Sequence, residues 1–322
     1  MTTAFYLPDT DVDRLRAFDP DRDWKLMVRG QRWVLQTFLR LREAGMDVEL
    51  VGEVPRSGVL VFHACEKRVL RERLPRGARL TLVGIRADAR PITIADVELL
   101  QNRRFAYGSR RVFVPYWPQP GLVPRDPRRG ARVERIAFKG FEENLHPDFL
   151  APAWSSWLEE HGMRWVLHST RFRGSSAGVG VDWHDYHDVD VVVALRPDPE
   201  SPQHRKPASK LCNAWQAGVP ALLGPEHAYR ELRRSELDYT EIRSSEDAKR
   251  ALERLRAEPQ LHQAIVANGR RRGEAFTVER IVEEWRELLE VVVPSLGPPG
   301  RRPPYWLRSA TRRLGALVHA RA

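Results

Sequence analysis

Short apolar segments alternate with longer amphipathic segments along most of this chain, and that alternation limits the folds open to it. Strand-like and helix-like segments in alternation are typical of proteins with parallel sheets. In the first third we expect strands at Trp24–Val28, Asp47–Val51, Val59–Phe62, Arg79–Ile85 and Arg111–Tyr116. We expect helices there at Gln31–Ala44, Glu66–Arg73 and Ile94–Gln101. The pattern predicts an α/β fold.

A stretch rich in proline and glycine, around residues 115–130, interrupts the alternation and has the composition of a linker. The 322 residues suffice for two domains of moderate size. We expect an N-terminal α/β domain at 1–118, a linker at 119–131, a second α/β domain at 132–292, and a proline-rich segment with a basic tail at 293–322. Ligands of such proteins bind in the cleft between the halves, at the carboxyl ends of the strands.

The second domain repeats the same alternation. Its expected strands are Val133–Phe138, Arg164–Leu167, Asp190–Leu195 and Val219–Leu223. Its expected helices are Pro152–His161, Pro207–Ala217, Glu226–Arg234, Ser245–Ala257, Gln260–Ala275 and Val278–Val291. Ser244 and Asp247 have the spacing of a capping box, which predicts the start of one helix.

The charge balance indicates an anionic partner. Lys and Arg number 53 and Asp and Glu 43, which gives a formal net charge of +10. The basic residues form no dense run interleaved with aromatic residues, so we do not expect nucleic acid as the partner. Two cysteines far apart, no signal-like start and no long apolar run favour a cytoplasmic protein, at most peripheral to a membrane.

The strongest local signal is the segment from Arg205 to Pro220. Pro207 suits the first position of a helix, which places Ser209 and Lys210 in its first turn. Free backbone N–H groups and the helix dipole attract anions there, and Lys206 would add a second ammonium group. These groups suit a diphosphate. The alternative is a helix that merely begins with proline and carries solvated lysines.

The block from Lys206 to Glu231 resembles the donor-site segment of GT-B glycosyltransferases, two-domain enzymes that use nucleotide-activated sugars. The similarity continues at residues 244–247 and 276–285, and it covers roughly residues 132–292. Residues 1–115 resemble these enzymes only in their α/β rhythm. The resemblance implies two Rossmann-like domains facing an interdomain cleft, and a bacterial glycosyltransferase of group 1 type.

The resemblance also assigns roles to individual residues of the second domain. Asn213 stands where the family has the glutamate that holds the ribose hydroxyls, and Arg205 stands where a second glutamate approaches the sugar. Both glutamates are absent; an amide can still bond a ribose, whereas Arg205 suits phosphate better. Gly140 resembles the glycine of the loop that opens the donor domain, and Arg196 the strand end where the nucleotide is met.

The first domain should then supply the acceptor site and any catalytic base. Arg29, Gly30 and Arg86 are expected at strand ends on the acceptor side. Asp88 and His63 are the candidate catalytic residues, because either side chain can deprotonate an acceptor hydroxyl. The alternatives are that Asp88 caps the next segment and that His63 is a satisfied histidine beside the core.

Two further segments and the tryptophans also bear on function. The histidines and aspartates of residues 184–190 have spacings at which a metal is conceivable, but we expect none. Residues 174–180 are expected to form a mobile glycine-rich loop. Trp157, Trp215 and Trp285 fall on apolar helix faces and should be core, whereas Trp117 and Trp183 flank loops where they could contact a sugar.

The tail, residues 305–322, has the pattern of a basic amphipathic helix. It could lie on an anionic membrane surface, dock on the first domain, or form a flexible end, and we favour the membrane.

The sequence therefore predicts a metal-independent glycosyltransferase with no cofactor beyond its nucleotide diphosphate sugar donor. Its acceptor would be a glycan or a lipid-linked molecule. The alternative is a non-catalytic subunit of the same fold that binds a nucleotide or glycan at the membrane.

Overall fold

The computed structural model describes residues 2–27, 29–108, 110–170, 182–201 and 205–297. Contacts divide them into two compact units, one running up to Pro115 and the other from Tyr116 to Arg280. The described residues from Ile281 onward belong with the first unit. This division differs from the bounds expected from the sequence, since the proline-rich stretch belongs with the second unit and the boundary after Arg280 falls inside the helix Val278–Glu287.

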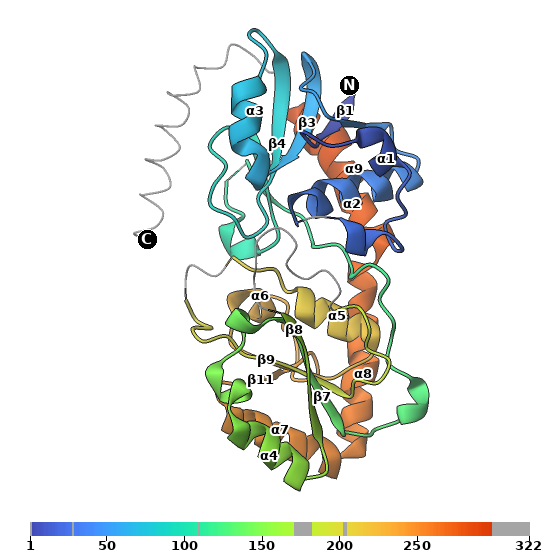
Figure 1. Ribbon diagram of the computed structural model, residues 1–322, viewed down its shortest axis with the longest axis vertical. Coiled ribbons are helices and arrows are strands. Elements are labelled where there is room, and N and C mark those ends of the chain that lie inside the picture. The colour runs from blue at the N-terminus through green and yellow to red at the C-terminus, as the bar shows by residue number, and fades with distance from the viewer. Residues whose placement is uncertain (1, 28, 109, 171–181, 202–204, 298–322) are drawn as a thin grey trace. The chain divides into compact units, whose positions relative to one another are not determined.

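The first unit is built on a parallel six-stranded sheet in the order β2-β1-β3-β4-β5-β6 (Figure 1). Its strands are β1 (Thr3–Tyr6), β2 (Val48–Val51), β3 (Ser57–His63), β4 (Arg79–Ile85), β5 (Val97–Leu100) and β6 (Arg111–Phe113). The central strands are buried along nearly their whole length, as is typical of parallel strands covered on both faces.

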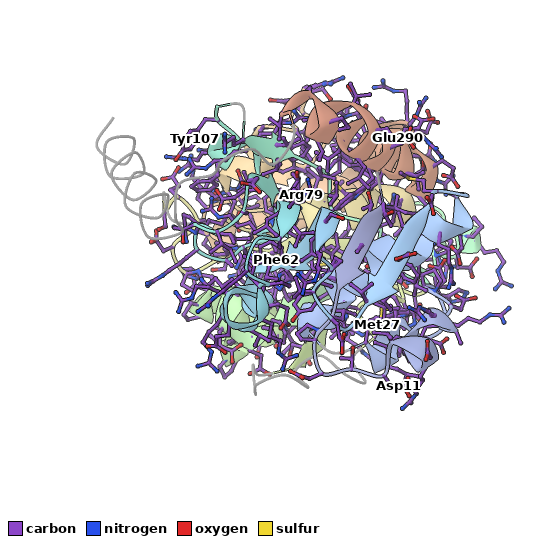
Figure 2. All side chains as sticks on the ribbon, turned by 90° about the horizontal axis from the view of Figure 1, so that it is seen from above. Asp11, Met27, Phe62, Arg79, Tyr107 and Glu290 are labelled. Carbon is purple, nitrogen blue, oxygen red and sulfur yellow. The ribbon has the colours of Figure 1, made fainter. Side chains whose placement is uncertain are left out.

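Helices cover both faces of this sheet. Phe5 of β1 packs against Phe38 of α2 (Arg29–Glu43) and Trp285 of α9 (Val278–Glu287) on one face. On the other face Leu70 of α3 (Lys67–Arg73) joins a core that includes Phe62 of β3, labelled in Figure 2. Short helices complete the unit: α1 (Val12–Arg16), 3-10 turns at Trp24–Leu26, Ala64–Glu66 and Arg103–Phe105, the π-helical turn Leu288–Val292, and α10 (Val293–Ser295).

Two of the elements expected in the first unit are wrong. Trp24–Leu26 forms a 3-10 turn rather than a strand, because Asp19 and Asp23 bind nearby backbone N–H groups and fold the chain locally. The segment expected as the helix Ile94–Gln101 instead contains β5, where Asp96 accepts a hydrogen bond from the backbone of Leu82 at 2.8 Å. Long-range pairing with β4 therefore overrides the helical pattern there.

The true first strand, β1, lies at the centre of the sheet between β2 and β3. The sequence did not predict it, since its four residues are buried on both faces and show no alternation. As a consequence, Arg29 and Gly30 do not follow a strand. They are the first two residues of α2, which is the expected helix Gln31–Ala44 with an earlier start.

The second unit is built on a parallel five-stranded sheet in the order β11-β10-β9-β7-β8. Its strands are β7 (Arg135–Phe141), β8 (Arg164–Thr170), β9 (Val191–Ala194), β10 (Ala221–Leu223) and β11 (Thr240–Glu241). Its helices are α4 (Pro152–Glu160), α5 (Ser209–Ala217), α6 (His227–Arg230), α7 (Ser245–Ala257) and α8 (Pro259–Gly273). Short 3-10 turns lie at Pro127–Arg129, Glu142–Asn144, Pro147–Leu150 and Glu274–Phe276.

Within this unit α4 lies beside α7, and α5 lies beside α8 (Figure 1). Successive residues of β7, which lies between β9 and β8, face opposite cores. Ile136 and Phe138 join the core that contains Trp154 of α4, whereas Ala137 joins a smaller core around Tyr186. Both faces of the sheet are covered, so the two Rossmann-like units confirm the α/β fold class.

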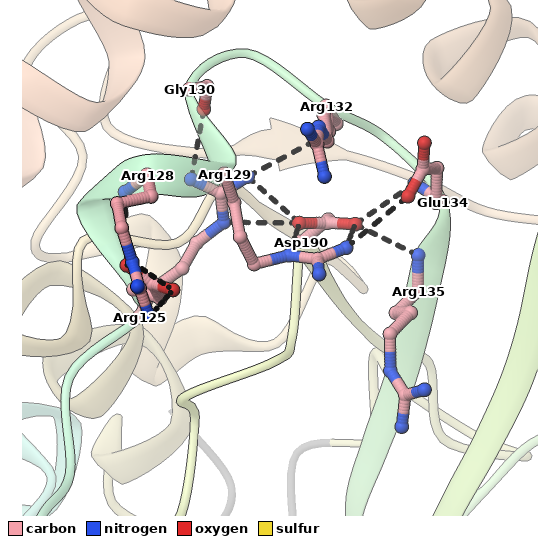
Figure 3. A network of polar contacts seen from close by, with 9 residues as sticks. Arg125, Arg128, Arg129, Gly130, Arg132, Glu134, Arg135 and Asp190 are labelled. Atoms are coloured by element: carbon pink, nitrogen blue, oxygen red, sulfur yellow. Dashed lines mark hydrogen bonds and ion pairs between the residues drawn. The ribbon is translucent and has the colours of Figure 1, made fainter.

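Asp190, at the start of β9, ties the proline-rich stretch to this sheet (Figure 3). Its carboxylate is completely buried and accepts hydrogen bonds from the guanidinium groups of Arg125 and Arg129 at 2.7 Å. It also accepts the backbone N–H groups of Glu134 and Arg135 at 3.0 and 2.9 Å. The segment expected as a linker is therefore fixed to the second unit by a buried ionic network.

Several local expectations for the second unit are confirmed. The helix Ser245–Ala257 has the expected bounds, and its N-cap Ser244 accepts the N–H of Asp247 at 3.1 Å. Gly218 ends α5 in the left-handed conformation, with φ of 70°. Among the described residues, no helix is long and apolar enough to cross a membrane.

Candidate functional site

The carboxyl edge of the second sheet carries the residues that the sequence singled out for donor binding. In a β9–α5–β10 unit the helix runs back against the strands, so its first turn lies at the carboxyl edge. Arg196 follows β9 by two residues, and Ser209 and Lys210 are the first two residues of α5. The structure therefore brings the strand end and the helix start to one edge.

The first turn of α5 differs from the expected one in one respect. Pro207 lies outside the helix, and Ala208 is its N-cap with no side-chain hydrogen bond. The backbone N–H groups of the first turn are consequently left without a capping side chain. Unpaired N–H groups at the positive end of a helix dipole are the standard components of an anion site.

Lys210 has an unusual environment for an ammonium group. Its Nζ lies 5.5 Å from the ring centroid of Phe138 on β7. Burial, together with the positive charges of Arg196 and Lys206, lowers the pKa of Lys210 to about 7, although Glu226 acts in the opposite direction. A cation that is partly desolvated and crowded by other cations gains strongly from an arriving anion.

Gly140 contributes space to this environment. The resemblance placed Gly140 in a loop. In the structure it lies inside β7, opposite Ser169 of β8. A Cβ at this position would lie 3.2 Å from Lys210 Nζ and 3.0 Å from the ring of Phe138. The bare backbone of Gly140 therefore leaves room for the Lys210 side chain.

Arg196 is held from two sides. Its Nη1 donates to Asn144 Oδ1, and its Nε pairs with Glu226 Oε1 at 3.3 Å. Arg196 and Glu226 are both more than nine-tenths buried. Burial raises the pKa of the Glu226 carboxyl to about 7, against the opposing charges of Arg196 and Lys210. The sequence analysis did not identify Asn144 or Glu226, and their spacing from Arg196 gave no signal for either.

Asn213 lies one turn beyond Lys210 on α5 and is buried. Its side chain hydrogen-bonds the hydroxyl of Tyr186, whose pKa is raised by complete burial. The Asn213 Oδ1 atom has no hydrogen-bond partner among the described residues. A buried acceptor without a partner is uncommon in folded proteins and requires an explanation.

The other donor-side candidates lie in the same segment. Arg205 and Lys206 are half-buried and precede α5, and Lys206 is close enough to Lys210 to affect its pKa. The structure thus brings Lys210 and Arg196 together beside the Glu226 carboxylate, with Lys206 close to Lys210. The ligand roles of Gly140, Arg196, Lys206, Ser209, Lys210 and Asn213 stay predictions.

In the first unit, two of the acceptor-side candidates lie at the carboxyl edge of its sheet. His63 ends β3 and pairs in register with Ile85 of β4, directly before Arg86. His63 Nδ1 accepts the N–H of Cys65 at 3.3 Å, and its ring stacks on Trp33 with centroids 6.2 Å apart. His63 therefore also forms the N-cap of the turn that follows its strand.

Arg86 and Asp88 follow β4. The Arg86 guanidinium is buried, donates to the carbonyl of Ala89 at 3.0 Å and lies 4.0 Å from Glu98. Ala87, between the two candidates, has a φ of 51°, which is unusual for a residue other than glycine. Asp88 itself is half-buried. The catalytic roles of Asp88 and His63, and the acceptor-side roles of Arg29, Gly30 and Arg86, stay predictions.

The tryptophans expected in the core are found there, but Trp117, expected beside a loop, is buried as well. Trp215 and Trp285 are buried and Trp157 packs against the core of the second unit, as expected. Trp117 is only 2% exposed, so its ring is not available to a sugar face. Trp183 is half-buried and donates to the carbonyl of His168 at 2.8 Å.

Two expectations fall outside the described residues, namely the glycine-rich loop at 174–180 and the amphipathic tail at 305–322. In the described part of the chain, no group of three or more His, Cys, Asp or Glu side chains could hold a metal ion. The histidines and aspartates of residues 184–190 were among the side chains that form no such group.

Comparison with solved structures identifies the fold. Sucrose-phosphate synthase from Thermosynechococcus elongatus superposes with a TM-score of 0.58 at 12% identity, covering 91% of this chain and 99% of that one. AviGT4, a glycosyltransferase involved in avilamycin A biosynthesis, gives 0.55 at 15% identity over 91% and 98%. HepE from Anabaena, in complex with UDP and glucose, gives 0.54 at 12% identity over 90% and 99%. No family model and no curated protein sequence matches this chain.

These similarities, together with the two parallel sheets, define a protein of the GT-B glycosyltransferase fold. The fold expected from the donor-site resemblance is thereby confirmed, and it extends over the first unit, where the sequence showed only an α/β rhythm.

Proposed function

We propose that this protein is a glycosyltransferase that takes its sugar from a nucleotide diphosphate donor bound at the carboxyl edge of the second sheet. The observation that carries the proposal is the half-buried, partly desolvated Lys210 beside Arg196 and the uncapped first turn of α5. The GT-B fold supports it, and in crystal structures the similar protein HepE is in complex with UDP-glucose.

In this proposal the cations stabilise the leaving group. When the bond between sugar and phosphate breaks, negative charge develops on the departing diphosphate. Lys210, Lys206, Arg196 and the N–H groups of α5 would stabilise that charge, so the reaction would need no metal ion and no further cofactor. The unpartnered Asn213 Oδ1 would accept a ribose hydroxyl, held in orientation by Tyr186.

The first unit would supply the acceptor side. His63 and Asp88 follow neighbouring strands of the first sheet, and either one could deprotonate an acceptor hydroxyl. We propose a glycan or a lipid-linked acceptor for a protein on the cytoplasmic side of a membrane, which residues 305–322 would contact.

Calorimetric titration of UDP, GDP, ADP, CMP and dTDP against the wild-type protein and Lys210→Ala tests the donor site. We expect one diphosphate to bind, and the variant to weaken it by about 10- to 150-fold, since a charged hydrogen bond contributes about 1.5–3 kcal/mol. Lys249→Ala, a lysine of α7 paired with Glu246, is the matched control and should bind like the wild type.

Unchanged binding in Lys210→Ala would contradict the placement of the diphosphate. Incubation with a panel of nucleotide sugars separates the enzyme from the alternative, a non-catalytic subunit of the same fold. Release of sugar or transfer supports the enzyme, whereas tight nucleotide binding without turnover supports the subunit.

A further inference from the structure

A carboxylate lies inside the proposed anion site, where repulsion between like charges would disfavour one. Glu226 is the N-cap residue of α6, three residues after β10, and is 6% exposed. Its Oε1 pairs with Arg196 Nε at 3.3 Å. Its Oε2 is buried and has no hydrogen-bond partner among the described residues. Such a group requires an explanation, because leaving a buried charged oxygen unsatisfied is costly.

The absence of a side chain at Gly224 leaves room for the carboxyl group. A Cβ on Gly224 would lie 2.6 Å from Glu226 Oε2, closer than atoms approach one another. Oε2 therefore packs directly over a residue that lacks a side chain, while Oε1 points at the guanidinium. The two oxygens have different surroundings, which suits a carboxyl group that carries its proton on Oε2 and accepts from Arg196 through Oε1.

Charged and titratable groups from several elements surround Glu226. Arg196 follows β9, Lys210 lies on α5, Glu241 lies on β11, and the hydroxyls of Tyr229 and Tyr239 are near enough to be affected by its charge. Lys210 in turn experiences Arg196, Glu226 and Lys206. Burial lowers the pKa of Lys210 and raises the pKa of Glu226, so the charge of each group can respond to an arriving anion.

We propose that Glu226 is a positioning residue of the diphosphate site, which holds Arg196 through the ion pair and takes up a proton on Oε2 when a diphosphate binds. The inference rests on the proposed donor site. The proton comes from solvent, and Arg196 keeps its contact with Oε1 while its other N–H groups bind phosphate oxygens. Neutralising the carboxyl group removes its repulsion of the arriving anion.

The affinity of this site for a diphosphate should depend on pH. A bound diphosphate is negatively charged, so it raises the pKa of both Glu226 and Lys210. Above pH 7 the free site has lost protons that the complex retains, so binding takes up protons and the affinity falls as pH rises. At lower pH, as both groups become protonated in the free protein, the number of protons that the protein takes up on binding should fall.

The experiment is calorimetry of inorganic pyrophosphate, and of the nucleoside diphosphate that binds, with the full chain from pH 6 to 8.5. Two buffers of different ionisation enthalpy report the number of protons taken up. For Glu226→Gln we expect up to about one proton fewer than for the wild type at pH 8. At pH 6 it should bind within about threefold of the wild type, because an amide oxygen still accepts from Arg196.

Glu226→Ala separates positioning from charge. It removes the repulsive carboxylate but also the acceptor that holds Arg196, so at pH 6 it should bind about 10-fold more weakly than Glu226→Gln. Glu160→Gln, which removes an exposed carboxylate at the end of α4, is the control and should retain the proton uptake of the wild type.

Two results would overturn the inference alone: wild-type proton uptake in Glu226→Gln, or equal binding by the Ala and Gln variants at pH 6. Absence of any diphosphate binding by the wild-type protein would instead overturn the donor site, and this inference with it. The two failures are therefore distinguishable.

Discussion

Buried arginine–carboxylate contacts have different consequences at two positions of the second unit. Around Asp190 every carboxylate oxygen is satisfied, and hydrogen bonds from Arg129 and neighbouring backbone groups lower its pKa although burial alone would raise it. Around Glu226 one oxygen is left without a partner and the pKa is raised. The first arrangement fixes structure, whereas the second keeps a proton available.

Asp190→Asn should destabilise the second unit by about 3–5 kcal/mol, because it leaves the buried guanidinium of Arg125 without its counter-charge. Chemical denaturation at pH 7 measures the loss. Asp188→Asn is the control: Asp188 pairs with Arg135 in a more exposed position and should cost no more than about 1 kcal/mol.

The difference in unfolding free energy between the wild type and Asp190→Asn should shrink as the pH falls. The pKa of Asp190 is lowered in the folded state, so its stabilisation is fully present above the unfolded pKa, about 4. It is lost as the pH falls through the lower, folded value. The gap between wild type and Asp190→Asn should therefore close below about pH 4, and a constant gap would contradict the ionic explanation.

Gly140→Ala tests the space beside Lys210. The new methyl group would press on the Lys210 ammonium and the Phe138 ring at 3.2 and 3.0 Å, so a neighbour must move by a few tenths of an ångström. We expect diphosphate binding to weaken by roughly fivefold, or about 1 kcal/mol, with the fold retained. Gly52→Ala, whose Cβ would meet its neighbours only at ordinary contact distance, is the control in the same titration.

At the scale of elements, the helix starts are the most testable features. Ser244 Oγ accepts the N–H of Asp247 at 3.1 Å and caps α7. Ser244→Ala should lower the free energy of unfolding by about 1 kcal/mol, within the range for lost N-caps. Ser245→Ala, which loses only an exposed contact with Asp148, should change stability less, and an equal loss would mean that the cap contributes nothing specific.

The elements that the sequence predicted well are those whose signal is local. Ser244 and Asp247 marked the start of a helix by their own backbone chemistry, and the cap is found where expected. The start of α5 was misjudged by two residues, since Pro207 can begin a helix but does not require one.

Elements defined by long-range pairing were missed. β1 and β5 are strands because their neighbours in the sheet satisfy their backbone groups, and no short window of sequence contains that information. The same applies to the site. Lys210 and Arg196 were identified from a motif and a strand end, but Glu226 becomes a candidate only when its distance to Arg196 is known.

At the scale of the whole molecule, the chain leaves the first unit near Pro115 and returns to it after Arg280. Trp285, on the returning helix, packs against Phe5 with ring centroids 6.2 Å apart and is buried. The core of the first unit is therefore made from residues near both ends of the described chain.

Trp285→Ala should destabilise the first unit by about 3–5 kcal/mol, the usual cost of removing a buried tryptophan. Hydrogen exchange measures where the loss falls: amides of β1 and α2 should exchange faster, while those of β9 and β10 keep their protection. Trp154→Ala, in the core of the second unit, should give the opposite pattern. Uniform loss of protection in both variants would show that the units unfold together.

The return of the chain also orders events during synthesis. Residues 116–280 emerge from the ribosome as a continuous stretch and can complete their own core as soon as they are free. The first unit, although translated earlier, lacks Trp285 beside Phe5 until α9 has been made. The half that is made first is thus finished last, and its exposed sheet face has to remain unaggregated for the time that the second half takes to be translated.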